Sequence, residues 1–180
     1  VTASGPSYGY CYTTLNGTCE IKSLWNGTYM VTAYPPYGSN LLENSTIANV
    51  TLGEVALANI TLLKGGILTG FVTDTNDTPV YNAVVSASGP SYGYDYTDLN
   101  GYYEIIGLKT GSYGVTADPP YNANLLQNST YANITAGETT VLNIKMQIGG
   151  RIIGKVTDVN KNPVADAYVA ASGPVYKYDY

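Results

Sequence analysis

Residues 92–106 read YGYDYTDLNGYYEII, a stretch that combines two strand-like runs with a tight-turn signal. Tyr92–Thr97 and Tyr102–Ile106 are rich in the aromatic and β-branched side chains that favour strands. Asp98–Gly101 lies between them, and its glycine can adopt the left-handed conformation that closes a type I turn with a bulge. We therefore expect a β-hairpin here and an all-β fold around it.

The sequence around this stretch occurs more than once. Val85–Pro90 reads VSASGP, and related hexapeptides lie 84 residues earlier at Val1–Pro6 and 84 residues later at Val169–Pro174. More than half of the positions shared by the first two copies are identical, without insertion or deletion. A period of 84 residues is long enough for each copy to bury its own core, which predicts tandem domains.

We divide the chain by this period into a first repeat that lacks its N-terminal strands, a complete second repeat, and the start of a third. Their ranges are 1–64, 65–148 and 149–180. Because the chain begins and ends within a repeat, we expect it to be an excerpt from a longer protein.

The second repeat predicts short strands at intervals of about ten residues, the pattern of a β-sandwich. Ile67–Asp74 and Val80–Ala87 form a hairpin or a strand-to-strand crossover, and Ser112–Ala117 follows the central turn. A long loop at Pro119–Ala136 precedes a closing strand at Thr139–Gln147. Seven strands per repeat is the expected count.

Four motifs in this order resemble the carboxypeptidase regulatory-like domain family. They are Gly70–Asp74 (GFVTD), Pro79–Val85 (PVYNAVV), Thr97–Tyr103 (TDLNGYY) and Gly107–Ala117 (GLKTGSYGVTA). The resemblance implies a prealbumin-like or immunoglobulin-like sandwich, used as a tandem module in secreted and cell-surface proteins of bacteria and archaea. It implies no activity and no cofactor, because in peptidases that carry such a domain the catalytic zinc lies elsewhere.

Half of the asparagines lie in Asn-x-Ser/Thr sequons, the acceptors of N-linked glycans. The eight acceptors are Asn16, Asn26, Asn44, Asn49, Asn59, Asn76, Asn128 and Asn133. Asn44 and Asn49 recur as Asn128 and Asn133 in the long loop, and these four are the best sites. The alternative is that a chain rich in Asn and Thr forms sequons by chance.

Cys11 and Cys19 are the only cysteines, and they flank the turn around Leu15–Gly17. If this turn closes a three-residue hairpin loop, the two side chains share a face at diagonal positions, close enough for a slightly strained disulfide. A disulfide fits an oxidising exterior. A metal site is the alternative, but the chain contains no histidine to complete it.

Tyrosine is abundant, with 19 copies against one Phe and one Trp. The sequence places three tyrosines on one strand face in each copy, at Tyr8, Tyr10 and Tyr12, at Tyr92, Tyr94 and Tyr96, and at Tyr176, Tyr178 and Tyr180. The stripe lines a sandwich core, or it makes contacts with neighbouring domains or stacks on sugar rings.

The remaining side chains indicate no enzyme. Acid–base chemistry would fall to carboxylates, yet Glu20 and Glu104 are copies of one position in successive repeats. Asp74, Asn76 and Asp77 offer oxygens to a calcium ion, although turn formation explains them better. We expect no metal and no cofactor.

Composition excludes two classes of partner. The net charge is −5, charged residues make up only 12% of the chain, and no basic stripe would bind nucleic acid or an anionic bilayer. No apolar run approaches the roughly 20 residues that a membrane-spanning helix needs. The expected partners are copies of the chain or neighbouring repeats, together with attached glycans.

These observations predict a structural segment of an extracellular filament, stalk or surface-layer fibre, most consistent in composition with an archaeal surface. The rival hypothesis is an adhesin or carbohydrate-binding array that uses the tyrosine faces. A variant of the first is strand donation, in which 149–180 completes Val1–Lys64 of another molecule. Against it, Val169–Tyr180 would duplicate Val1–Tyr12, and an excerpt explains the ends more simply.

Overall fold

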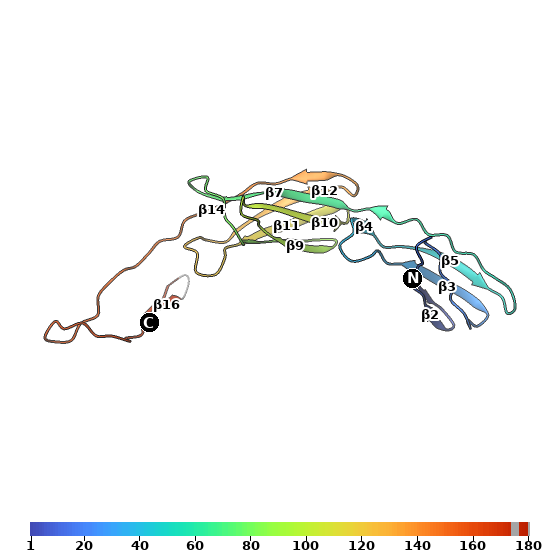
Figure 1. Cartoon of the computed structure of the whole chain (residues 1–180), viewed down its shortest axis with the longest axis horizontal. Helices are drawn as coiled ribbons and strands as arrows, with labels where there is room; N and C mark the ends of the chain where they lie inside the picture. Colours follow the sequence, from blue (N-terminus) through green and yellow to red (C-terminus); the bar gives the residue numbers. More distant parts are fainter. Residues whose placement is uncertain (174–176, 180) are drawn as a thin grey trace. The chain divides into compact units, whose positions relative to one another are not determined.

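The computed structural model describes residues 1–173 and 177–179, the last three by their backbone. The chain forms two compact units, Val1–Gly149 and Gly150–Tyr180. Every regular element in the described residues is a β-strand, which confirms the all-β fold class (Figure 1).

The second repeat is a sandwich of two sheets. One sheet has the order β10-β7-β13, with β14 also paired to β7, and the other has the order β12-β11-β8-β9. The strands are β7 (Gly66–Asp74), β8 (Val84–Ser88), β9 (Tyr92–Tyr96), β10 (Tyr102–Leu108), β11 (Gly111–Asp118), β12 (Asn128–Ile134), β13 (Thr139–Val141) and β14 (Ile144–Met146).

The core of this sandwich follows from alternation along the strands. In β7, Leu68 and Val72 are fully buried while Phe71 between them is exposed. Successive side chains of a strand point to opposite faces, so alternate residues of each sheet meet in the middle. Tyr113 and Leu108 complete the same buried cluster.

The expected hairpin at residues 92–106 is wrong, although its turn forms. Gly101 has a φ of 77° and donates its N–H to the Asp98 carbonyl. However, β9 pairs with β8 and β10 pairs with β7, so the two strands belong to different sheets. The hydroxyl of buried Thr97 holds the end of β9, because it donates to the Val80 carbonyl and accepts from the Ala83 N–H.

Two other expectations change in detail. Between β7 and β8 the chain crosses from one sheet to the other. Of the two alternatives, the crossover is therefore correct and the hairpin is not. The expected closing strand is divided into β13 and β14, separated by Leu142 and Asn143, so the second repeat has eight strands where seven were expected.

The expected long loop contains a strand. Most of its second half is β12, which pairs with β11 from Gly111–Ile134 to Ala117–Asn128. Its composition, rich in Pro, Tyr and Asn, suggested a loop, but Ala132 and Ile134 alternate inward and are buried. Cross-strand pairing and burial of this face outweigh the low strand propensity of the asparagines in β12.

The first repeat contains only one of the two large sheets. Its order is β2-β1-β3-β5, the counterpart of β9-β8-β11-β12. The strands are β1 (Thr2–Ser4), β2 (Tyr8–Tyr10), β3 (Gly27–Ala33) and β5 (Asn44–Val50), with a short pair formed by β4 (Leu41–Leu42) and β6 (Leu63–Lys64). Its buried cluster is small, consisting of Ala3, Tyr29, Val31 and Ala48.

In the described residues of the unit Gly150–Tyr180, β15 (Val169–Ala171) pairs antiparallel with β16 (Lys177–Asp179). A turn after Asp158 is closed by a bridge between Thr157 and Pro163. Of the third tyrosine stripe, Tyr176 and Tyr180 lie outside the described residues, and Tyr178 is described by its backbone.

Candidate functional site

The four recurring sequon asparagines lie on edge strands rather than in loops. Asn44 and Asn49 belong to β5, and Asn128 and Asn133 belong to β12. Each of these strands is the outermost of its sheet. Five residues of strand separate the two asparagines of a pair by about 17 Å.

Hydrogen bonds fix these side chains in the same way in both repeats. Asn44 Nδ2 donates to the Thr61 carbonyl at 2.8 Å, and Asn128 Nδ2 donates to the Lys145 carbonyl at 2.8 Å. Asn49 Oδ1 instead accepts a hydrogen bond from the Thr28 hydroxyl. In the second pair, Asn133 Oδ1 accepts from the Ser112 hydroxyl.

Asn49 and Asn133 are exposed, and each accepts its hydrogen bond through Oδ1, so these bonds do not use the amide nitrogen to which a glycan would be attached. Asn44 and Asn128 can keep their bonds after modification, because a glycosylated amide retains one N–H. The other four sequon asparagines are exposed: Asn16, Asn26, Asn59 and Asn76.

The tyrosine stripes of the first and second repeats are exposed and do not line the core. Tyr92, Tyr94 and Tyr96 are 67%, 56% and 54% exposed along β9. Their ring centroids lie 6.2 Å and 6.0 Å apart. In the first repeat, Tyr8, Tyr10 and Tyr12 are exposed in the same manner. These exposed fractions exclude the interpretation that the stripes line the sandwich core and leave the one in which they lie at the surface.

Different tyrosines fill the cores, and sequence patterning did not single them out. Tyr113 is fully buried, and its hydroxyl lies 2.6 Å from Ser91 Oγ and donates to the Lys109 carbonyl at 2.9 Å. Tyr29 repeats this arrangement with Ser7 Oγ at 2.6 Å. The conserved spacing of Ser and Tyr between the copies was the available signal.

Cys11 and Cys19 form a disulfide in the structure, with Cα atoms 5.9 Å apart. Their counterparts are Asp95 on β9 and Tyr103 on β10. In the second repeat these strands are linked by a hydrogen bond from the Glu104 N–H to Asp95 Oδ2. The disulfide therefore places a covalent link just after β2, where the second repeat uses a carboxylate to join β9 to β10.

Asp74 acts as a turn former. Its Oδ1 accepts hydrogen bonds from the Asn76 and Thr78 N–H groups. The bond from Thr78 is the main reason that the pKa of Asp74 lies below its usual value. Within the described residues, no three Asp, Glu, Cys or His side chains cluster as metal ligands would.

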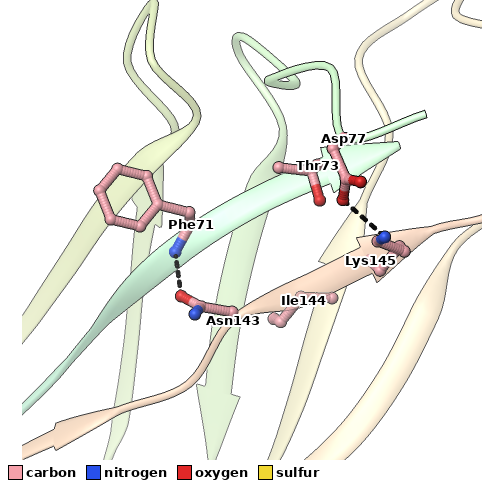
Figure 2. Close-up of a pocket in the computed structure, with 6 residues that line it drawn as sticks. All are labelled: Phe71, Thr73, Asp77, Asn143, Ile144 and Lys145. Carbon is pink, nitrogen blue, oxygen red and sulfur yellow. Dashed lines mark hydrogen bonds and ion pairs between the residues drawn. The ribbon is translucent and has the colours of Figure 1, made fainter. Parts of the chain in front are cut away.

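A shallow hollow of 270 Å³ lies where β14 joins β7. Figure 2 shows Asn143 at its rim, where Oδ1 accepts the Phe71 N–H at 3.0 Å, and Lys145 facing Asp77 at 2.6 Å. Asn143 thus bridges the break between β13 and β14 and keeps both strands on β7. The polar groups of Asn143, Lys145 and Asp77 that line the hollow are therefore already bonded within the protein.

A much larger groove of 1370 Å³ opens in the first repeat. It is lined by core residues such as Ala3, Tyr29 and Val31 and by apolar side chains such as Ile21, Leu24 and Ile60. The counterparts of these residues, 84 positions later, pack against β7. We call this feature the open groove.

The two repeats meet at a junction that sequence reasoning missed. Asn40 Oδ1 accepts the Gly107 N–H at 2.8 Å, and its carbonyl accepts the Gly65 N–H at 3.1 Å. Lys109 and Glu43 form an ion pair at 3.0 Å. The next copy of the motif, Asn124, holds Gly149 through the same backbone bond, at 2.9 Å.

The second repeat is similar to a known family of protein domains. Residues 67–147 match the carboxypeptidase regulatory-like domain family. The matched range coincides with the sandwich from β7 to β14, so the expected resemblance is confirmed for this part of the chain. No curated protein matches the chain.

Solved structures with similar chains include a cohesin–X-dockerin complex and two pilus proteins. A cohesin–X-dockerin complex of Acetivibrio cellulolyticus is 25% identical over 52% of this chain and 65% of its own, with a TM-score of 0.36. A streptococcal ancillary pilin is 14% identical over 87% and 57%, with a TM-score of 0.44. The pilus 2b backbone protein of group B streptococcus is 18% identical over 71% and 52%, with a TM-score of 0.36.

The chain spans less than two thirds of each of these neighbours. In the described residues, no helix is long and apolar enough to span a membrane.

Proposed function

We propose that the chain is a structural segment of an extracellular, N-glycosylated filament, stalk or surface-layer fibre, built from serial β-sandwich repeats. The observation that carries this proposal is the recurrence of paired sequons on the edge strands β5 and β12. An exposed edge strand presents unpaired backbone groups that invite aggregation, and bulky glycans at both ends protect it.

The junction supports the serial arrangement. Asn40 joins the first repeat to the second, and Asn124 repeats part of the same bonding at the end of the second. Equal interfaces between equal repeats generate an array with a constant rotation and rise. The Cys11–Cys19 disulfide fits an oxidising exterior. An archaeal source remains part of the proposal, on composition alone.

The test is glycopeptide mass spectrometry and cryo-electron microscopy of the native material. We expect glycans on Asn44, Asn49, Asn128 and Asn133, and a fibre with a regular axial repeat. Bare asparagines on dispersed particles would contradict the proposal.

A second candidate function is carbohydrate binding, and the exposed column of Tyr92, Tyr94 and Tyr96 favours it. Exposed aromatic faces stack on sugar rings. Because these rings lie outside the core, replacing all three with alanine should leave the second repeat folded. Glycan binding that is lost in this variant and kept in Tyr131→Ala, another exposed tyrosine, would favour the binding module.

A further inference from the structure

Tyr131 and the sequon asparagine Asn133 lie on the same face of β12. Side chains two residues apart on a strand share a face and are separated by about 7 Å along it. Both residues are exposed, Tyr131 by 82%, whereas Ala132 and Ile134 point into the core. A glycan acceptor and an unpacked aromatic ring are therefore neighbours on the outer surface of the sandwich.

The strand next to β12 leaves room beside the Tyr131 ring. Tyr131 pairs with Gly114 of β11, and Gly114 pairs with Ser88 of β8. A Cβ atom at Gly114 would meet nothing closer than the Ser88 carbonyl oxygen, at 3.9 Å. We call Ser88, Gly114 and Tyr131 the glycine row. None of the three is charged, so the row offers an aromatic ring, a hydroxyl and bare backbone.

The Asn133 amide is held in a way that keeps its nitrogen available. Ser112 lies opposite Asn133 on β11, and its hydroxyl donates to Asn133 Oδ1. The Nδ2 atom, to which a glycan is attached, takes no part in this bond. The bond can therefore persist after glycosylation and fix the point from which the first sugar starts.

Side chains with this spacing touch elsewhere on the same sheet. Tyr92, Tyr94 and Tyr96 occupy every second position of β9, and their ring centroids lie 6.2 Å and 6.0 Å apart. A sugar ring on the Asn133 amide stands off the strand about as far as a tyrosine side chain does. It therefore comes within contact distance of Tyr131.

We propose that Tyr131 is a stacking site for the glycan on Asn133, whose first sugar ring packs its C–H face against the tyrosine and lies over Gly114. The inference deepens the proposed function and rests on it for the glycan. An uncharged pyranose is the ligand class, because the glycine row holds no charge to pair with an ionic sugar. A glycan held in this way covers the exposed edge of β12.

Attachment makes the chain's own glycan the occupant of this site. Contact between one sugar ring and one tyrosine is weak, but a short tether holds the ring at a roughly millimolar effective concentration. The column Tyr92–Tyr96 belongs to β9, three strand spacings or about 14 Å from Tyr131. The stacking site is therefore separate from the surface of the second candidate function.

The first repeat has the acceptor but lacks the site. Asn49 is the counterpart of Asn133, yet Ile47 replaces Tyr131 and Met30 replaces Gly114. Ile47 and Met30 are 69% and 58% exposed, so the Met30 side chain stands where the second repeat has bare backbone. The glycan on Asn49 has no ring to stack on, and the two repeats provide a comparison within one chain.

The experiment uses the 180-residue chain secreted by a host that N-glycosylates it, with occupancy of Asn133 measured by glycopeptide mass spectrometry. Thr135→Ala removes the sequon and keeps both Asn133 and Tyr131. We expect nuclear Overhauser contacts between the first sugar and the Tyr131 ring. We also expect amide exchange in β12 to be about three- to tenfold slower than in Thr135→Ala.

Variants of the row test each part of the site. Tyr131→Ala should abolish the contacts and the slower exchange, and Tyr131→Phe, which keeps the ring, should retain both. Gly114→Met copies the first repeat and should weaken both, and the space above Gly114 lets this variant fold. Conversely, Met30→Gly with Ile47→Tyr should create the same contacts for the glycan on Asn49.

A glycosylated Asn133 without contacts to Tyr131 overturns the inference and leaves the filament proposal standing. Contacts that disappear on dilution also overturn it, because they come from the glycan of a neighbouring molecule. An equal effect of Tyr131→Ala with and without the glycan does so too, since the ring then only covers Gly114. A bare Asn133 instead contradicts the proposed function, and the inference falls with it.

Discussion

Tyr103 and Cys19 occupy the same position in successive repeats but are held by different bonds. Tyr103 is fully buried on β10, and its hydroxyl donates to the Leu142 carbonyl at 2.7 Å. Cys19 bonds instead to Cys11. One position therefore joins β10 to the break between β13 and β14 in the second repeat, and in the first it is linked covalently to the residue that follows β2.

Burial gives Tyr103 a measurable pH dependence, because it raises the pKa of the hydroxyl above the ordinary value of 10.0. Above pH 10 the unfolded chain loses this proton while the folded chain keeps it, so the free energy of unfolding falls as pH rises. Below pH 10 both states keep the proton, so the contribution of the Tyr103 hydroxyl to the free energy of unfolding is complete.

The variant Tyr103→Phe should lose about 1 kcal/mol at neutral pH, through the missing hydrogen bond. Its deficit relative to the parent should shrink as pH rises above 10, as measured by denaturant titration. Tyr131→Phe, at an exposed position, is the control. A deficit that stays constant across this range would contradict the account.

At the scale of elements, the sequence predicted turns well and strand partners poorly. Asp98–Gly101 forms the expected turn because its signals are local: an aspartate oxygen accepts two backbone N–H groups and a glycine adopts a positive φ. Whether β9 then pairs with β10 or with β8 depends on contacts such as that of Thr97 with Val80. Those contacts are distant in sequence.

The sites show the same division. The sequon asparagines could be found from the sequence, but their place on edge strands depends on pairing between β11 and β12. The tyrosine stripe was correctly placed on one strand face, yet only the sheet order decides whether that face is inside or outside. Asn40 was missed because its partner Gly107 belongs to the next repeat.

The disulfide should stabilise the first repeat alone. Closing a loop between residues eight apart is worth roughly 2–3 kcal/mol in chain entropy. We expect Cys11→Ser with Cys19→Ser to increase hydrogen exchange at 13–24 and to leave β7 to β14 unchanged. Adding a reductant should increase hydrogen exchange at 13–24 in the parent chain in the same way, and should not change exchange in the variant. Increased exchange in the second repeat would show that the two repeats unfold together.

At the scale of the whole molecule, the junction between repeats contains one side-chain amide. The Asn40 side chain accepts the Gly107 N–H, beside the backbone bond from the Gly65 N–H to the Asn40 carbonyl and the half-exposed Lys109–Glu43 ion pair. A half-exposed ion pair contributes about 0–1 kcal/mol, whereas loss of a partner for a half-buried N–H costs about 1–3 kcal/mol.

We therefore expect Asn40→Ala to loosen the junction and Lys109→Met to change it little. Residual dipolar couplings of the two repeats, measured by nuclear magnetic resonance, would report this as independent alignment in the first variant only. Equal behaviour of both variants would argue against the amide as the determinant.

The parallel pairing of β14 with β7 has a mechanical consequence. The first and last strands of the second repeat run side by side in the same direction, so its two chain ends leave from opposite ends of the sandwich. Tension applied along the chain loads the bonds of Val72–Ile144 through Asp74–Met146 in shear, and they must rupture together rather than unzip one by one. A repeat with this topology resists stretching along the chain.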